Sequence, residues 1–591
     1  MKKALLVAIN SRFSHTNLAV RSITGYVNSH KSPHENYDIS FLECTIAQPL
    51  LEILRTIAEV KPTMVLFSVY IWNSPQVWSI VAELKKILPS ILIGAGGPEA
   101  GYRSDELFEK IPELDFIMQG EGEQTILEIM ETPHISTETL TKIPGVFTRL
   151  GFGGERPLLP DLSELPFPYP EIQNPDFTEQ DTRIYYYESS RGCPFNCAYC
   201  MSSIDKRVRF MPLEKTFQDI QRFLDAHIKL VKFVDRTFNL NTSRYIAIWD
   251  YICTHHNGYT MFHFEIATQQ LDEQALDYIQ SVPKGIMQFE IGVQSIHEKT
   301  LAAVGRPAKI EVLAEKIRRV PKTIHSHLDL IAGLPYETLT EFAKSFDYTI
   351  GLYPDMLQLG FLKVLSGTTM EIYAKNNNYQ WLSQPPYEVL STPDLPYEDL
   401  LFLKDIELVL DIYNNSGNFK STIHFIQSIV SPKKGMFAFF SSMVHWLHNQ
   451  FPGEFYLPRK TGTWFQLFSD FMSTQKYQLD FSSEQIDVFF ELLRFDFLSL
   501  GKPGAIPQWC NRSYNKDAHH KALLTYTDMT STRESYSYSE YEEFAVNPLS
   551  GSAEKVGILF LYPKPKSGVR NQEVQFHLCP ILLETYPEHN Q

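Results

Sequence analysis

The chain has 591 residues, of which 43% are hydrophobic and 21% are charged, so it can bury several domain-sized cores. Its 53 Lys and Arg against 69 Asp and Glu give a formal charge of −16, which argues against a dedicated nucleic-acid binder. No apolar run approaches the roughly 18 residues of a membrane-spanning helix, and residues 4–9 are too short an apolar run for a signal peptide.

Residues 1–150 alternate short apolar runs with amphipathic stretches. We expect strands at 3–9, 37–43, 64–69, 91–95 and 115–118, and helices at 17–29, 50–60, 76–88, 104–110 and 123–130. Apolar strands that alternate with helices predict a parallel sheet covered on both faces. The region is therefore predicted to be a five-stranded, doubly wound domain of the flavodoxin or Rossmann type, with a ligand site at the carboxyl ends of its strands.

Glycines and prolines crowd residues 151–182 and predict a linker. From 183 to 384 the alternation resumes, with strands expected at 185–189, 230–235, 261–267, 285–293, 323–331 and 356–361. Helices are expected at 213–226, 244–255, 272–281, 308–320 and 338–352. Six such units predict a partial (β/α)6 barrel of the TIM type, with functional groups on the loops after its strands.

Residues 385–591 are predicted to form a mainly helical domain. Helical spacing is clear at 397–413 and 484–498, and Ser482 stands in capping-box register with Gln485. Two late apolar runs, 555–562 and 573–578, predict strands.

Three of the seven cysteines lie in one short segment. Cys193, Cys197 and Cys200 have C-x3-C-x2-C spacing directly after the strand expected at 185–189. No fourth Cys or His lies at a plausible interval for structural zinc. Three thiolates on one loop could hold an iron–sulfur cluster and leave one iron open for a substrate or cosubstrate. The odd, sparse set predicts a reducing cytoplasm, with single cysteines that are bystanders at Cys44, Cys253, Cys510 and Cys579.

The cysteine loop resembles the signature of radical S-adenosylmethionine (SAM) enzymes. The resemblance extends to residues 233–239, 289–295 and 329–335 at later strand ends. It implies that Cys193, Cys197 and Cys200 hold a 4Fe-4S cluster, which cleaves SAM to a 5′-deoxyadenosyl radical. The SAM-binding residues it implies are Tyr199, Asp235, Glu265, Gly292 and Gln294.

The amino-terminal region resembles the cobalamin-binding domains that precede some radical SAM barrels. The resemblance rests on residues 68–73, 94–99 and 120–123, where small residues at strand ends open a slot. The implied cobalamin-binding residues are Ser68, Tyr70, Gly96, Gly97, Pro98, Gly120 and Glu121. A dinucleotide fingerprint is disfavoured because Glu99 stands where it needs glycine. His15 lacks the neighbours of a cobalt-binding motif, so we expect a cobalt without a histidine ligand.

The combined resemblance is to cobalamin-dependent radical SAM proteins with a carboxy-terminal domain of unknown function (DUF4080-like). It implies a methyltransferase that acts on an unactivated carbon of a small molecule or peptide. It also implies an external electron donor such as flavodoxin or ferredoxin. Cyclisation or ring rearrangement remains open, as does an amino-terminal domain that is only a scaffold. Transfer-RNA methylthiotransferases are disfavoured because residues 1–150 contain only Cys44.

Overall fold

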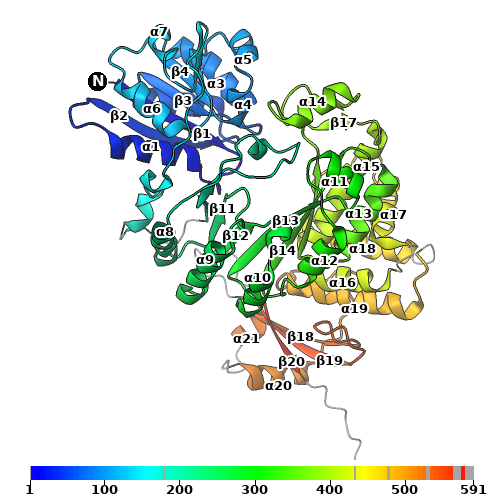
Figure 1. The fold of residues 1–591 in the computed structure, drawn as a ribbon. Helices are drawn as coiled ribbons and strands as arrows, with labels where there is room; N and C mark the ends of the chain where they lie inside the picture. The colour runs from blue at the N-terminus through cyan, green and yellow to red at the C-terminus, as the bar shows by residue number, and fades with distance from the viewer. Residues whose placement is uncertain are drawn as a thin grey trace, which may run out of the picture. The chain divides into compact units, whose positions relative to one another are not determined.

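The computed structural model describes residues 2–174, 176–177, 182–430, 434–475, 479–527, 533–563 and 574–579 (Figure 1). The chain divides into two compact units. One comprises Met1–Ser345 and Leu359–Leu400, and the other comprises Phe346–Gln358 and Leu401–Gln591. No helix in the described ranges is long and apolar enough to cross a membrane.

The first unit begins with a seven-stranded sheet of order β2-β1-β3-β4-β5-β6-β7. Its five parallel strands are β1 Lys2–Asn10, β2 Tyr37–Thr45, β3 Met64–Ser68, β4 Leu92–Gly96 and β5 Phe116–Met118. The main helices are α1 Leu18–His30, α2 Leu50–Val60, α3 Ser74–Ile87, α5 Ser104–Lys110 and α6 Gly122–Glu131. Helices α1 and α6 pack together, as do α2 and α3, so the predicted doubly wound fold is confirmed (Figure 1).

Two short strands extend this sheet beyond the five that were predicted. Strands β6 Val146–Thr148 and β7 Gly151–Phe152 add antiparallel to β5. Residues 151–152, at the start of the predicted linker, form β7, and strands of two or three residues are too short to show an alternating pattern in the sequence. The apolar core lies between the strands and helices α2 and α3, and it includes Val7, Phe67, Ile57 and Ile80.

A second, six-stranded sheet has the order β15-β14-β13-β12-β11-β8. Its strands are β8 Ile184–Tyr187, β11 Leu230–Phe233, β12 Met261–Glu265, β13 Met287–Gln294, β14 His325–Ala332 and β15 Met356–Phe361. Strands β8 to β14 pair in parallel. The helices between them are α8 Leu213–Asp225, α9 Thr242–His255, α10 Glu273–Tyr278, α11 Glu298–Ala303, α12 Ile310–Arg318 and α13 Leu339–Ile350. The predicted partial (β/α)6 barrel is confirmed, with α11 as an additional short helix.

The second unit is mainly helical, as predicted. Its helices include α16 Lys420–Ile429, α17 Gly435–Gln450, α18 Thr461–Gln475, α19 Ser483–Ser499 and α20 Lys516–Tyr526, and α15 Tyr397–Leu410 leads into it. The capping box of Ser482 and Gln485 is present at the start of α19. The predicted late strands form β19 Val556–Leu561 and β20 Gln575–Cys579, joined by the unpredicted β18 Ser539–Phe544. Strand β18 was not predicted because its sequence is acidic. In the structure, Glu542 of this strand is buried and paired with Arg494.

Candidate functional site

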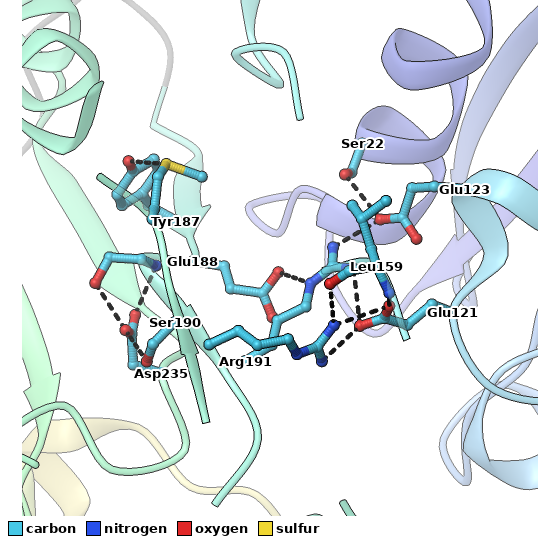
Figure 2. Close-up of polar contacts among 12 residues, drawn as sticks. Ser22, Glu121, Glu123, Leu159, Tyr187, Glu188, Ser190, Arg191 and Asp235 are labelled. Carbon is cyan, nitrogen blue, oxygen red and sulfur yellow. Dashed lines mark hydrogen bonds and ion pairs between the residues drawn. The ribbon is translucent and has the colours of Figure 1, made fainter. Parts of the chain in front are cut away.

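The cysteine loop starts from a firmly anchored strand end. Asp235, just beyond β11, is buried, and its carboxylate accepts hydrogen bonds from the Ser189 amide at 2.9 Å and hydroxyl at 2.7 Å and from the Ser190 hydroxyl at 2.5 Å (Figure 2). Burial raises the pKa of Asp235 to about 6. These bonds fix Ser189 and Ser190, the two residues from which the loop departs. The Asp235 carboxylate therefore already has partners within the chain. Its predicted contact with SAM stays a prediction.

The three cysteines of the loop are free thiols. Cys193 and Cys197 are buried and Cys200 is half-buried. The loop folds tightly, with the Cys193 amide donating to the Asp205 carbonyl at 2.9 Å and the Cys200 amide to the Cys197 carbonyl at 3.0 Å. Among the described residues no three His, Cys, Asp or Glu side chains are arranged to hold a single metal ion. A cluster does not need that arrangement, because each cysteine binds a different iron.

Two glycines allow this loop to pack closely against its surroundings. Gly192 has a φ of +90°, and a Cβ there would lie 2.2 Å from the Arg207 carbonyl oxygen. Gly305 has a φ of +69°, and its Cβ would lie 2.4 Å from the Asn196 carbonyl oxygen. Any larger residue would displace backbone at these two points, so both glycines are required by the fold of the loop.

Arg306 lies against the loop and was missed from the sequence. Its guanidinium donates to the Cys197 sulfur at 3.8 Å and to the Gly292 carbonyl at 2.7 Å. A guanidinium in this position can offset the negative charge of a thiolate, which is the form of cysteine that binds iron. Arg306 stands 109 positions from Cys197 in the sequence, so no local pattern connects the two residues. The sequence feature beside it that could have indicated a close approach is Gly305.

The predicted pair Gly292 and Gln294 forms one structural feature at the end of β13. The strand has a bulge there, and Gln294 has a φ of +70°. A Cβ at position 292 would lie 2.0 Å from the Gln294 amide nitrogen, so the glycine makes room for the folded-back glutamine. The buried side-chain oxygen Oε1 of Gln294 has no hydrogen-bond partner in the described residues, nor has the Tyr199 hydroxyl. Burial raises the pKa of Tyr199. Unpartnered buried polar atoms are costly, so they fit a polar ligand.

Ionisable side chains line up across β12, β13 and β14. The register pairs Glu265 with Glu290, Glu290 with His327, and Gly292 with Asp329. The His263 Nε2 atom lies 3.1 Å from the Glu290 carboxylate, and the His327 Nε2 atom lies 3.2 Å from that of Asp329. The strand sequences carried a signal for these histidines, because polar residues alternate with apolar ones in both β12 and β14.

Crowding of carboxylates shapes the electrostatics of this group. Burial raises the pKa of Glu265 to about 7, and burial together with the charges of Glu290 and Glu265 raises that of Asp329 well above its ordinary value. Burial opposes the ionisation of Glu290, yet the hydrogen bond from His263 holds its pKa below the ordinary value. The group therefore has one strongly ionised carboxylate and two that hold protons to higher pH.

The predicted cobalamin residues gather at one edge of the first sheet. The register pairs Ser68 with Gly96, and Gly96 with Met118, which ends β5 two residues before Gly120. Gly97 has a φ of +101° and its Cβ would lie 2.5 Å from the Val69 carbonyl oxygen. The next residue, Pro98, begins the short α4 helix, Pro98–Gly101. Gly120 has a φ of +84°, and a Cβ there would make an ordinary contact with the Arg156 side chain at 3.9 Å, so the backbone conformation is what favours glycine at this position.

The other residues of this edge already have partners in the chain. The Tyr70 ring stacks on Trp72 at 4.3 Å, and burial raises the pKa of its hydroxyl. The Glu121 carboxylate accepts from Arg209 at 2.8 Å and from the Leu159 amide at 2.6 Å. The His15 Nδ1 atom lies 2.5 Å from the Tyr186 hydroxyl in the barrel, so this ring also has a partner within the chain.

Family models match three stretches of the chain. Residues 4–130 match the B12 binding domain, residues 187–349 the radical SAM superfamily, and residues 375–547 a protein of unknown function, DUF4080.

Two curated relatives and one solved structure extend these matches. The cobalamin-dependent radical SAM methyltransferase TokK of Streptomyces tokunonensis is 23% identical over 400 residues, or 62% of this chain and 57% of TokK. The anaerobic magnesium-protoporphyrin IX monomethyl ester cyclase of Synechocystis is 23% identical over 57% of this chain and 70% of the cyclase. The cobalamin-dependent SAM radical enzyme OxsB, solved with aqua-cobalamin and SAM, has a TM-score of 0.59 at 14% identity and covers 84% of this chain and 79% of OxsB. The chain thus carries a B12-binding domain, a radical SAM domain and a DUF4080 domain, in that order.

Proposed function

We propose that this protein is a cobalamin-dependent radical SAM enzyme that methylates an unactivated carbon. The observation that carries the proposal is the loop of three free cysteines at the end of β8, in a chain whose preceding domain matches the B12-binding family. When bound, the cluster supplies the electron that cleaves SAM, and cobalamin supplies the methyl group. The similarity to TokK supports this function.

Cys193, Cys197 and Cys200 would hold the cluster. Arg306 offsets thiolate charge at Cys197, and Asp235 holds the start of the loop in place. The buried atoms without partners at Tyr199 and Gln294 would bind polar groups of SAM, together with Glu265 and the Gly292 turn. Low water content around these residues would protect a carbon radical from side reactions.

Cobalamin would bind at the carboxyl edge of β3, β4 and β5. The turn at Gly96, Gly97 and Pro98 and the turn at Gly120 would accept it, and Ser68, Tyr70 and Glu121 border the same edge. We propose domain boundaries at 1–150, 151–182, 183–384 and 385–591, and the matched ranges 4–130 and 187–349 support the first two domains. We also propose a cytoplasmic location, a small-molecule or peptide substrate, and an external donor such as flavodoxin or ferredoxin.

An anaerobic reconstitution tests the function. The protein is loaded with iron and sulfide, incubated with hydroxocobalamin and SAM, and desalted, and retained cobalamin and the products of SAM are measured. Retention of cobalamin with both S-adenosylhomocysteine and 5′-deoxyadenosine supports methylation. Loss of all cobalamin on desalting contradicts the proposal. It would favour the alternative in which the amino-terminal domain is only a scaffold.

A cysteine pair provides the matched control. Cys197→Ala should abolish the cluster and the reductive cleavage of SAM, whereas Cys253→Ala, on α9, should leave both intact. Persistent cleavage in Cys197→Ala would contradict the assignment of the loop.

Radical cyclisation is the second candidate, because the magnesium-protoporphyrin ester cyclase is similar over 57% of this chain. The same assay separates it from methylation. Formation of 5′-deoxyadenosine without S-adenosylhomocysteine would favour cyclisation or rearrangement.

A further inference from the structure

Arg191, two residues before Cys193, joins the cysteine loop to the preceding domain. Its guanidinium donates to Glu123 at 2.6 Å, pairs with Glu121 at 3.2 Å and donates to Glu188 at 2.7 Å (Figure 2). Glu121 and Glu123 follow β5 in the first sheet, whereas Glu188 follows β8. Two of the three carboxylates around Arg191 thus belong to the B12-binding domain.

A second arginine repeats the connection from the other end of the loop. Strand β9, Ser190–Arg191, pairs antiparallel with β10, Arg209–Phe210, and the register places Arg191 opposite Arg209. Arg209 donates to Glu121 at 2.8 Å and to the Leu159 carbonyl at 2.7 Å. All three cysteines lie between these two arginines. Both ends of the cysteine loop are therefore tied to the segment that follows β5.

The side chains of Arg191 and Glu123 are largely buried, so their relative position is tightly restricted. The Glu123 side chain is 5% exposed and that of Arg191 is 14% exposed. Burial opposes the ionisation of Glu123, yet the charge of Arg191 holds its pKa below the ordinary value. The Ser22 hydroxyl in α1 also donates to Glu123 at 3.2 Å. Buried ion pairs add little net stability but strongly disfavour any arrangement that separates them.

We propose that the Arg191 network, comprising Arg191, Arg209, Glu121, Glu123 and Glu188, positions the cysteine loop relative to the cobalamin edge. The network sets the separation of the two cofactors. This inference rests on the proposed function for what the two sites bind, whereas the tie between the loop and the β5 edge is a property of the chain alone. Arg191 is a positioning residue, since its contacts are with other side chains.

Hydrogen exchange of the full-length, cofactor-free protein tests the tie. Glu123→Gln keeps the size of the side chain and removes its charge. It should speed exchange at the amides of residues 189–193, which lie in the other domain. Glu131→Gln, at the far end of α6, makes the same chemical change away from Arg191 and should leave these amides unaffected. Equal exchange of residues 189–193 in the two variants would overturn the proposal.

A spectroscopic measurement tests the consequence for the cofactors. Both cob(II)alamin and a reduced 4Fe-4S cluster are paramagnetic, so their magnetic coupling reports their separation in the reconstituted protein. Arg191→Met should broaden the distribution of separations, and Arg191→Lys, which keeps the charge, should restore part of its sharpness. An unchanged distribution in Arg191→Met, with cluster and cobalamin both loaded, would overturn the positioning role.

The two measurements separate this inference from the proposed function. A wild-type protein that retains no cobalamin would contradict the proposed function, and hydrogen exchange would still decide the tie. If Glu123→Gln does not fold, Arg191→Lys takes its place in the exchange experiment, since a lysine cannot satisfy three carboxylates. Faster exchange at residues 189–193 would then support the tie, and exchange equal to that of the wild type would overturn it.

Discussion

The doubly wound sheet and the barrel sheet are both built mainly from parallel strands, but they place their ionisable groups differently. In the first sheet, β1 is buried without interruption from Ala4 to Asn10. In the second, β14 alternates His325, His327 and Asp329 with the buried residues Ser326, Leu328 and Leu330. Helices pack on both faces of the first sheet, so its inner strand β1 carries no ionisable side chain from Ala4 to Asn10. Ionisable side chains occupy alternate positions along the strands of the second sheet, so these strands themselves provide groups that can bind a ligand or exchange protons.

The largest effect is expected from the apolar interior of the first sheet. Phe67 is 1% exposed, and Phe67→Ala should cost about 3–5 kcal/mol of unfolding free energy because it leaves a cavity. Denaturant unfolding measures this loss. Leu51→Ala, where the leucine is 78% exposed, should change stability by less than about 0.5 kcal/mol. Equal effects of the two variants would show that the interior of this sheet is not tightly packed.

A buried carboxyl beside the barrel should make stability depend on pH. Glu337 is 0% exposed, accepts from the hydroxyls of Ser295 at 2.8 Å and Ser345 at 2.6 Å, and has its pKa raised by burial to about 7. Its ordinary value is 4.5, so its contribution is fully present below pH 4.5 and is lost as the pH rises through 7. The loss is on the order of 3 kcal/mol, from about 1.4 kcal/mol per unit of pKa.

Glu337→Gln isolates this contribution, because glutamine does not ionise. Unfolding free energies measured below pH 4.5 and above pH 7 should differ less in the variant than in the wild type. Other buried carboxyls, such as Glu99, whose pKa burial raises to about 7, will keep a residual slope in both proteins. A slope that is as steep in the variant as in the wild type would contradict the prediction.

The turn at Gly97 tests the edge of the first sheet. Gly97 has φ of 101° and ψ of 170°, a region open essentially only to glycine, and its Cβ would meet a backbone oxygen. Gly97→Ala should therefore cost about 2–3 kcal/mol and weaken cobalamin retention. At Gly154, φ is +91° but no described atom lies within 4 Å of a Cβ, so Gly154→Ala should cost less and leave retention unchanged. Calorimetry and cobalamin retention measure the two effects, and a larger loss at Gly154 would contradict the argument.

The smallest effect is expected inside the barrel. Glu290→Gln removes the charge that faces His263 and His327, and because the glutamate side chain is 31% exposed the cost should be about 1–2 kcal/mol. Glu83→Gln, at an exposed pair with Lys86, should cost less than about 0.5 kcal/mol. Denaturant midpoints compare the two variants. Unfolding of the Glu290→Gln protein would show that the barrel depends on this carboxylate as strongly as the first sheet depends on Phe67.

Particular residues show how far sequence patterns reached. The cysteine spacing and the order of the strands predicted the loop after β8, and the capping pair Ser482 and Gln485 predicted the start of α19. Strands β6 and β7 were missed because they are too short for periodicity, and β18 was missed because Glu542 has a buried partner. Arg306 was missed because its contact with Cys197 joins segments 109 residues apart.

The sequence by itself determined the local order of this protein: the two series of alternating strands and helices, the spacing of three cysteines, and glycines where the backbone must turn. These features depend on neighbours in the chain, and composition and periodicity record them. Tertiary structure alone decided which charges meet. The contacts of Arg191 with Glu123 and of His263 with Glu290 depend on strand register and domain packing. Burial opposes the ionisation of both glutamates, and these partners hold the pKa of each glutamate below its ordinary value.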